Sequence, residues 1–335
     1  MTAISCLSLV SPVGYSPASA VAAMRAGIAA FGELPYRDAN GEAILGAVVN
    51  AFAPDLRGRD RLSALVEFAI DQLDPDATEA LPWGQMPLIL CTREPEMPGG
   101  RINGILGGIT LPHGAPLAGP KSGHIAAGPI SAFAAISRAR DLLQNRDVPA
   151  CIVLAVDSLI DARTLGWLDA RARLKTTIET DGLIPGEGAC ITVVSRQPIT
   201  QSHVIVRGLG LGRETATIYN EEPLRANGLT AALKIALEEA GVHMHDVAFR
   251  LSDVAGESYA FEELVLAQMR TMRKTRPEQP VWHAADCIGD SGAAAGLIQF
   301  AWAEQAYKRN YAPGAIAALH GSSSFGGRAA AIVTA

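Results

Sequence analysis

The sequence predicts an α/β protein made of two copies of one helix–strand unit. Residues 128–158 and residues 292–322 both read as a helix, a turn and a buried strand, and an offset of 164 residues carries Pro149 onto Pro313. The strands that follow, GEGACITVV and FGGRAAAIV, also match in kind. Because this offset is about half of the 335-residue chain, the repeat indicates a duplicated domain rather than a solenoid.

Strand and helix patterns alternate along both halves. Short apolar runs predict strands at residues 3–10, 44–49, 87–91, 150–156, 189–194, 204–211, 248–251 and 280–284. Helical spacing predicts helices at residues 16–27, 61–73, 130–143, 229–240 and 259–272, and residues 291–333 read as helix, turn, strand, loop and strand. Unbroken apolar strands between helices are typical of parallel sheets covered on both faces. We therefore expect two sheets in a five-layered α/β/α/β/α sandwich, with halves at residues 1–200 and 201–335.

Composition excludes several classes of protein. The net charge of −6 is spread without a basic cluster, so nucleic-acid binding is not expected. No apolar run approaches the ~18 residues that span a bilayer, and the N-terminal apolar run lacks a preceding basic segment, so we expect a cytoplasmic protein without a membrane anchor. The five cysteines lie far apart, without a Cys-x-x-Cys pair, which is typical of reduced thiols in a core.

Two segments of the first half bear on assembly and binding. The PLILC run at residues 87–91 suits a strand buried on both faces, and we take it as the candidate seam of a dimer. Residues 94–121 hold several glycines and prolines. A loop this long is usually a binding loop, a lid or an interface arm, and a mobile surface insertion is the alternative.

Three segments resemble β-ketoacyl synthases of the thiolase superfamily. IGDSGAAAGLIQFAWA at residues 288–303 and SSSFGGRAAAIV at residues 322–333 resemble the two C-terminal signatures, and GPISAFAAISRA falls where the nucleophile motif belongs. The resemblance covers nearly the whole chain and implies a duplicated thiolase-like fold. It also implies condensation of acyl thioesters by a cysteine at a helix N-terminus, helped by two histidines or by a histidine and an asparagine.

The chain departs from the family at each catalytic position. Alignment with the family's TACSSSLxAI pattern puts Pro129 at the cysteine, the HGTGT-like loop puts Ala255 at the first histidine, and the KxxIGH motif puts Ala285 at the lysine and Asp290 at the second histidine. Proline offers no nucleophile, and its missing N–H weakens an oxyanion hole built from that helix start. Aspartate near neutral pH accepts hydrogen bonds rather than donating them, unless burial keeps it protonated. No catalytic residue of the family is therefore expected to remain.

The surroundings of the site are better preserved. A pocket is expected at Gly128, Ser131, Cys287, Ser323, Ser324, Phe325 and Gly326. A serine there could act as a nucleophile only beside a base, for which His124 and His320 are candidates, and each lone histidine is more often solvated or bonded to the backbone. His243 and His245 would need distant ligands to hold a metal, so neither a metal nor another cofactor is expected.

Two functions remain open at this stage. The first is a non-catalytic partner, scaffold or chain-length-factor-like subunit beside an active synthase, or an adaptor for a secreted effector. The second is an acyltransferase or 3-oxoacyl-ACP synthase that acts on acyl thioesters by a displaced mechanism. The expected assembly is a homodimer, or a heterodimer with a paralogous synthase, and acyl carrier protein is a further possible partner.

Overall fold

The computed structural model describes residues 2–53, 55–74, 78–79, 81–100, 104–117, 121–200 and 203–335. Its strands are β1 (Thr2–Val10), β2 (Phe31–Arg37), β3 (Ala43–Ala47), β4 (Leu88–Thr92), β5 (Gly123–Ala126), β6 (Ala150–Ser158), β7 (Glu187–Ser195), β8 (Val204–Arg213), β9 (Phe249–Ser252), β10 (Val281–His283), β11 (Ile316–Ser322) and β12 (Gly327–Thr334). Its helices are α1 (Pro17–Arg25), α2 (Gly58–Asp71), α4 (Ser131–Leu142), α5 (Ala162–Asp169), α6 (Asn227–Ala240), α7 (Ser258–Thr271), α8 (Ala285–Ile288) and α9 (Ala295–Lys308).

One ten-stranded sheet runs through the molecule in the order β10-β9-β11-β12-β8-β1-β7-β6-β4-β5. The prediction of two separate sheets is wrong, because β1 and β8 pair antiparallel at Thr2–Val206, Ala3–Ile205 and Ile4–Val204. On each side of this joint the three outer strands run parallel and the next strands run antiparallel. The pairing pattern thus repeats in both halves, and the boundary at residue 200 stays a prediction.

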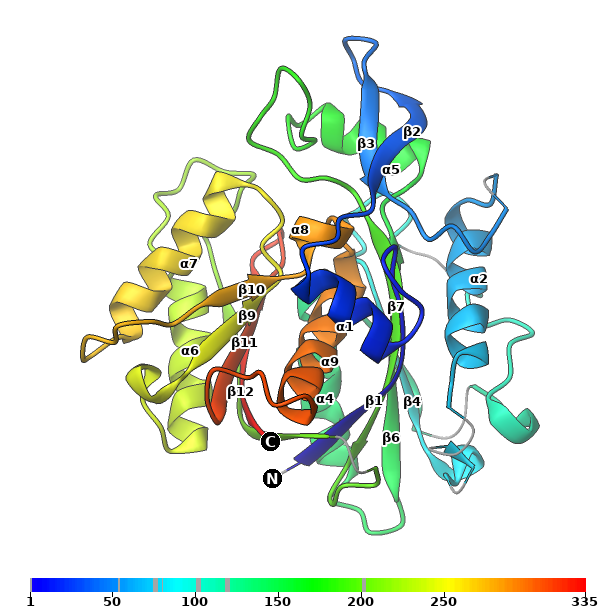
Figure 1. Ribbon diagram of the computed structural model, residues 1–335, viewed down its shortest axis with the longest axis vertical. Helices are drawn as coiled ribbons and strands as arrows, with labels where there is room; N and C mark the ends of the chain where they lie inside the picture. Colours follow the sequence, from blue (N-terminus) through cyan, green and yellow to red (C-terminus); the bar gives the residue numbers. More distant parts are fainter. Residues whose placement is uncertain are drawn as a thin grey trace.

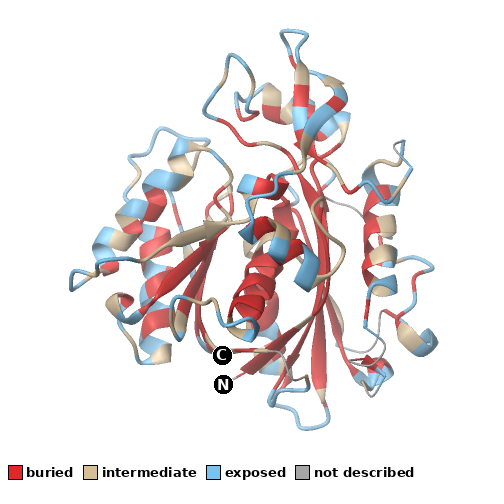
Figure 2. Ribbon diagram, viewed as in Figure 1, coloured by how far each residue is buried: buried red, intermediate tan, exposed pale blue. Residues whose placement is uncertain are grey.

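Helices cover both faces of the two half-sheets and fill the space between them. Figure 1 shows α2 on one outer side, α1, α4 and α9 in the centre, and α6 and α7 on the other outer side. These layers follow the order helix, sheet, helix, sheet, helix, which is the predicted five-layered arrangement. Residues 296–306 of α9 are buried on every side, as expected for a helix of a central layer (Figure 2).

The seam predicted at residues 87–91 does not lie at an edge. β4 pairs with β6 on one side and with β5 on the other, so the edge strand of this half is β5. The GHIA sequence of β5 is only four residues long and contains a glycine, which is why it gave no strand signal. β2 and β3 form a separate two-stranded hairpin outside the large sheet.

The glycine- and proline-rich segment packs against α2 where it is described. Ile105, Ile109, Leu111 and Leu117 are buried in the outer core with the apolar face of α2. The Ser63 hydroxyl donates a hydrogen bond of 2.8 Å to the Ile105 carbonyl. The buried apolar residues of this loop therefore extend the core between α2 and the sheet. Among the described residues, no helix is long and apolar enough to cross a membrane.

The two central helices α4 and α9 begin in the same way. Each follows a short 3₁₀ turn, at Gly128–Ile130 and at Gly292–Ala294, and both first glycines have positive φ, +56° and +53°. A Cβ atom on Gly128 would lie 2.3 Å from the Glu94 carboxyl, and one on Gly292 would lie 2.2 Å from the Asp157 carboxyl. Only glycine fits at either position, because both the backbone angle and the space require it. The starts of both helices therefore approach buried carboxyl groups closely.

Candidate functional site

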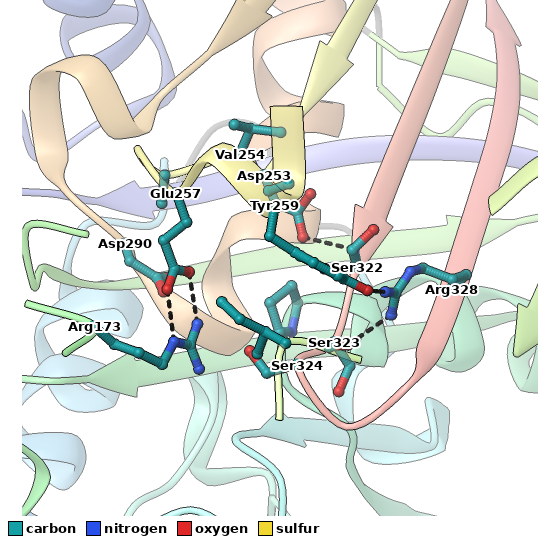
Figure 3. A pocket seen from close by; sticks show the side chains of 14 residues that line it. Arg173, Asp253, Val254, Glu257, Tyr259, Asp290, Ser322, Ser323, Ser324 and Arg328 are labelled. Carbon is teal, nitrogen blue, oxygen red and sulfur yellow. Dashed lines mark hydrogen bonds and ion pairs between the residues drawn. The ribbon is translucent and has the colours of Figure 1, made fainter. Parts of the chain in front are cut away.

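Pro129, Ala255 and Asp290, which the motif alignment predicted to stand at catalytic positions, line one small cavity. Its volume is about 60 Å³. The remaining lining comes from the segment after β9 and the start of α7, from the end of β11 and the loop after it, from Ile218 and from two arginines: Arg173, Ile218, Asp253, Val254, Glu257, Tyr259, Ala260, Ser322, Ser323, Ser324 and Arg328 (Figure 3). Three segments far apart in the sequence thus meet where the resemblance places the site.

Pro129 lies in the 3₁₀ turn that leads into α4. Its ring occupies a helix-start position where a backbone N–H would otherwise be free, so it costs the helix little. The space beside it is taken by Glu94, whose carboxyl group lies against Gly128. This helix start therefore presents neither a thiol nor its full set of N–H groups to the cavity.

Asp290 is held between α8 and the turn before α9. Its backbone N–H donates to the Ile184 carbonyl and its carbonyl accepts from the Gly186 N–H, both at 2.8 Å. Its carboxylate accepts a 2.8 Å hydrogen bond from the Gly292 N–H. Burial raises the pKa of Asp290 to about 6, while this bond and the nearby Arg173 act in the opposite direction. Near pH 7 the ionised form of Asp290 prevails, and it accepts hydrogen bonds.

Two more buried carboxyl groups adjoin the cavity, and the sequence analysis missed both. Glu94 accepts a 2.6 Å hydrogen bond from the Ser323 hydroxyl. Asp253 accepts a 2.7 Å hydrogen bond from the Ser322 N–H. Burial raises the pKa of each to about 7. Because Asp253 follows β9 directly and Glu94 follows β4 after one residue, their positions after buried strands were the available signal.

Ion pairs close the other sides of the cavity. Arg173 donates two hydrogen bonds of 2.6 Å to Glu257. Arg328 donates bonds of 2.6 and 2.8 Å to Glu263, which also accepts a 2.8 Å bond from the Ser322 hydroxyl. Arg328 and Glu263 are almost fully buried, at 1% and 0% exposure. Each arginine is matched by a carboxylate, so neither is left to attract an anionic substrate.

The other predicted pocket residues divide into two groups. Ser323 and Ser324 line the cavity. Gly128, Ser131, Cys287, Phe325 and Gly326 are not among its lining residues. The buried Ser131 hydroxyl donates to the Gly128 carbonyl at 2.6 Å. The Cys287 thiol faces α1, with its Sγ 3.7 Å from the Met24 carbonyl oxygen.

Phe325 and Gly326 shape the loop beside the cavity. The Phe325 ring lies 5.2 Å from the ring of Tyr219, and the Tyr219 ring lies 5.8 Å from that of Trp167. Gly326 has a φ of +97°, and a Cβ atom there would meet the Glu214 carbonyl at 2.6 Å. This glycine is required by the turn itself.

The candidate bases His124 and His320 are not among the residues that line the cavity. His124 shares a 2.7 Å hydrogen bond with the Thr92 hydroxyl, and burial lowers its pKa. His320 is buried on β11, where burial and then the nearby Arg250 lower its pKa to about 3. The rings of His243 and His245 stack at 5.1 Å. Within the described part of the chain, no group of three histidine, cysteine or acidic side chains is arranged to hold a metal ion.

The cavity suits ordered water better than an acyl chain. Ligand pockets usually enclose roughly 300–1,000 Å³, and a water molecule takes about 30 Å³. A volume of about 60 Å³ is therefore room for about two waters. Its polar groups are largely bonded to one another.

No protein-family model and no curated protein sequence matches this chain. Solved structures do match its fold. The ishigamide ketosynthase/chain length factor aligns with a TM-score of 0.72 at 19% identity over 99% of both chains. A ketosynthase in complex with its chain length factor from Xenorhabdus doucetiae gives 0.75 at 15% identity, over 99% of this chain and 97% of that one. A type II polyketide ketosynthase solved with its acyl-carrier protein gives 0.78 at 12% identity, over 100% and 98%. The chain thus has the mixed α/β, thiolase-like fold of the ketosynthases.

Proposed function

We propose that this protein is a ketosynthase-like subunit without condensing activity, which acts as a partner or scaffold beside an active synthase. The observation that supports this most is Pro129 at the helix start where the family carries its cysteine. Condensation passes through a covalent acyl-enzyme, and proline provides no atom to form one. Ala255 and Asp290 supply no replacement for the two histidines. We propose a role like that of a chain length factor, because the chain has the ketosynthase fold but lacks the residues that condensation needs.

The state of the cavity supports the same proposal. Glu94 occupies the space beside Gly128, and Arg173 and Arg328 are each matched by a glutamate. An acyl chain would have to displace these bonded groups from a volume of about 60 Å³. Leaving a buried charge without its partner costs several kcal/mol, so the cavity resists opening.

The partner we propose is a paralogous synthase or a second copy, joined along the free edge of β5. An edge strand exposes unpaired N–H and C=O groups that another strand can satisfy. The matched structures include a ketosynthase in complex with its chain length factor. We also consider two other partners, acyl carrier protein and a secreted effector. In the second case this protein would be the adaptor that binds the effector.

Two measurements test this proposal together. The purified protein is incubated with acyl-loaded carrier protein and examined by intact mass, and it is co-expressed with a synthase from its own cell and examined by light scattering. We expect no acyl adduct and a stable heterodimer. A stoichiometric adduct would refute the non-catalytic role, and a protein that remains monomeric with and without the synthase would refute the partner role.

A second candidate is an acyltransferase or 3-oxoacyl-ACP synthase with a displaced nucleophile, and the pair Ser323–Glu94 favours it. A serine hydroxyl needs a base within hydrogen-bond reach, and Glu94 lies at 2.6 Å. Since the pKa of Glu94 is raised to about 7, the carboxylate form is well populated near neutral pH. One contact argues against this second candidate, because the Ser323 hydroxyl already accepts a 3.1 Å hydrogen bond from the Phe325 N–H. An acyl adduct that is lost in Ser323→Ala and kept in Ser324→Ala would establish this candidate.

A further inference from the structure

Two thiols lie next to each other on neighbouring strands in the middle of the sheet. The Sγ atoms of Cys6 on β1 and Cys190 on β7 are 3.6 Å apart, although the two residues are 184 positions apart in the sequence. All five cysteines of the chain are free. The thiols of Cys151 and Cys287 lie instead against backbone carbonyl oxygens of α4 and α1. Cys6 and Cys190 are therefore placed to react with each other.

The pairing of β1 with β7 brings the two thiols to the same face of the sheet. Cys6 pairs with Thr192, which is two positions from Cys190 along β7, and side chains two apart in a strand share a face. The register shifts between Cys6 and Ser8, as at a β-bulge. This face turns toward α9 in the central layer, where the Cys6 N–H donates a 2.7 Å hydrogen bond to Glu304 (Figure 1).

We propose that Cys6 and Cys190 form a site of reversible oxidation, at which the two thiols join in a disulfide by exchange with a small-molecule disulfide such as oxidised glutathione. Cys6 reacts first, because it is half-buried whereas Cys190 is fully buried. Its thiolate attacks one sulfur of the oxidant, forms a mixed disulfide and releases one glutathione thiolate. The Cys190 thiolate then attacks the Cys6 sulfur and releases the second one.

The balance of this reaction is complete. The two protein thiols give up two protons and two electrons, and the oxidant takes both up as it becomes two molecules of glutathione. A disulfide bond is about 2.05 Å long, so the two sulfurs have to approach each other by about 1.5 Å. The inference goes beyond the proposed function and does not rest on it.

The surroundings of Cys6 set the speed of the exchange. The contact with Cys190 and then burial raise the pKa of Cys6 well above its ordinary value. Little thiolate is therefore present at neutral pH, and only the thiolate reacts. The pair should respond to sustained oxidation and remain reduced during a brief one.

Counting free thiols tests the inference. The folded protein is incubated with oxidised glutathione and then unfolded, and its remaining thiols are alkylated and counted by intact mass. The wild type should lose two of its five thiols, and peptide mapping should link Cys6 to Cys190. Cys6→Ser should lose none, and Cys190→Ser should stop at the mixed disulfide on Cys6. Cys151→Ser is the matched control and should lose two thiols, as the wild type does.

Two further readouts depend on the same bond. The rate of thiol loss should rise about tenfold from pH 7 to pH 8, because the fraction of thiolate rises by that factor. The oxidised wild type should unfold at a higher urea concentration than the reduced protein, because the bond restricts the unfolded chain. Cys6→Ser should unfold at the same urea concentration with and without oxidant.

Three outcomes would overturn the inference. The first is that the folded wild type keeps all five thiols. The second is that glutathione stays on Cys6 of the wild type, which would show that Cys190 cannot reach it. The third is that the link forms only at urea concentrations that unfold the protein, since the folded arrangement of β1 and β7 would then not be its cause.

Discussion

The Glu94 carboxyl group accepts a 2.6 Å hydrogen bond from the Ser323 hydroxyl, joining residues 229 positions apart beside the helix start at Gly128. This contact ties the segment after β4 to the loop between β11 and β12. Glu94 is 8% exposed and is not neutralised by a cation among the described residues, so its protonation bears on the stability of the whole site.

Glu94→Gln should change how stability depends on pH. The pKa of Glu94 is raised from 4.5 to about 7. Between these values the folded state holds a proton that the unfolded state has lost, so the contribution of Glu94 to stability falls as pH rises through this window. Glutamine mimics the protonated acid. The variant should therefore gain stability relative to wild type by about 3 kcal/mol from pH 4.5 to pH 8, measured by urea unfolding. Glu96→Gln, at an exposed position of the same loop, should leave the wild-type pH dependence unchanged.

Arg328→Met should be strongly destabilising. It leaves Glu263 at 0% exposure without its cation, and breaking such a pair costs about 3–5 kcal/mol. Adding Glu263→Gln should recover part of the loss, because the remaining group is neutral. Arg59→Met, at a pair whose side chains are 61% and 68% exposed, should cost less than about 1 kcal/mol. If Arg328→Met and Arg59→Met lost the same free energy of unfolding, burial would not be the reason why the Arg328–Glu263 pair matters.

Gly292→Ala should cost more than Gly27→Ala, although both glycines have positive φ. Nothing lies within 4 Å of a Cβ atom added at Gly27. Gly27→Ala should therefore be destabilised only by its positive φ, by about 1 kcal/mol. At Gly292 the Cβ atom would overlap the Asp157 carboxyl, which bonds Arg93 at 2.6 Å. We expect a loss of about 3 kcal/mol or more, from the added steric overlap and the disturbed buried pair. The stabilities of Gly292→Ala and Gly27→Ala are compared by measuring the thermal unfolding of both variants under the same conditions.

Pro129→Cys alone should not restore condensation. A thiol at this position would lie near the Glu94 carboxyl group, whose negative charge disfavours the thiolate. Ala255 and Asp290 would still provide no donor for the oxyanion. The new cysteine should take no acyl group from acyl-loaded carrier protein and should be alkylated no faster than a free cysteine peptide. Rapid acylation would show that the site needs only its nucleophile.

Burial patterns made most of the large sheet predictable. β6 and β7 are buried at every position, and the mostly apolar runs at residues 150–156 and 189–194 that predicted them lie inside these strands. β5 carries glycine and the polar His124 in four residues, and no periodicity can be read from so short a strand. The joint between β1 and β8 is equally invisible, since pairing between distant strands leaves no local mark on either one.

The sequence indicated which three aligned residues would lie together, but few of the groups around them. Motif alignment brings Pro129, Ala255 and Asp290 together, and all three line the cavity. Arg173 and Glu257 are separated by 84 positions, and nothing near either residue announces its partner. Ser131 and Cys287 lie close to the site in sequence, yet helix geometry turns their side chains toward Gly128 and α1. The direction in which a side chain points depends on the tertiary structure, whereas its position in a motif can be read from the sequence.

The place of β1 in the sheet has a consequence for the timing of synthesis. β1 ends at Val10, and its principal partner β7 begins at Glu187, 177 residues later. At about 5–20 residues per second, a ribosome takes roughly ten to forty seconds to cover that distance. Throughout this interval an apolar strand waits without its native neighbours. During this interval β1 is thus exposed to chaperones and to aggregation.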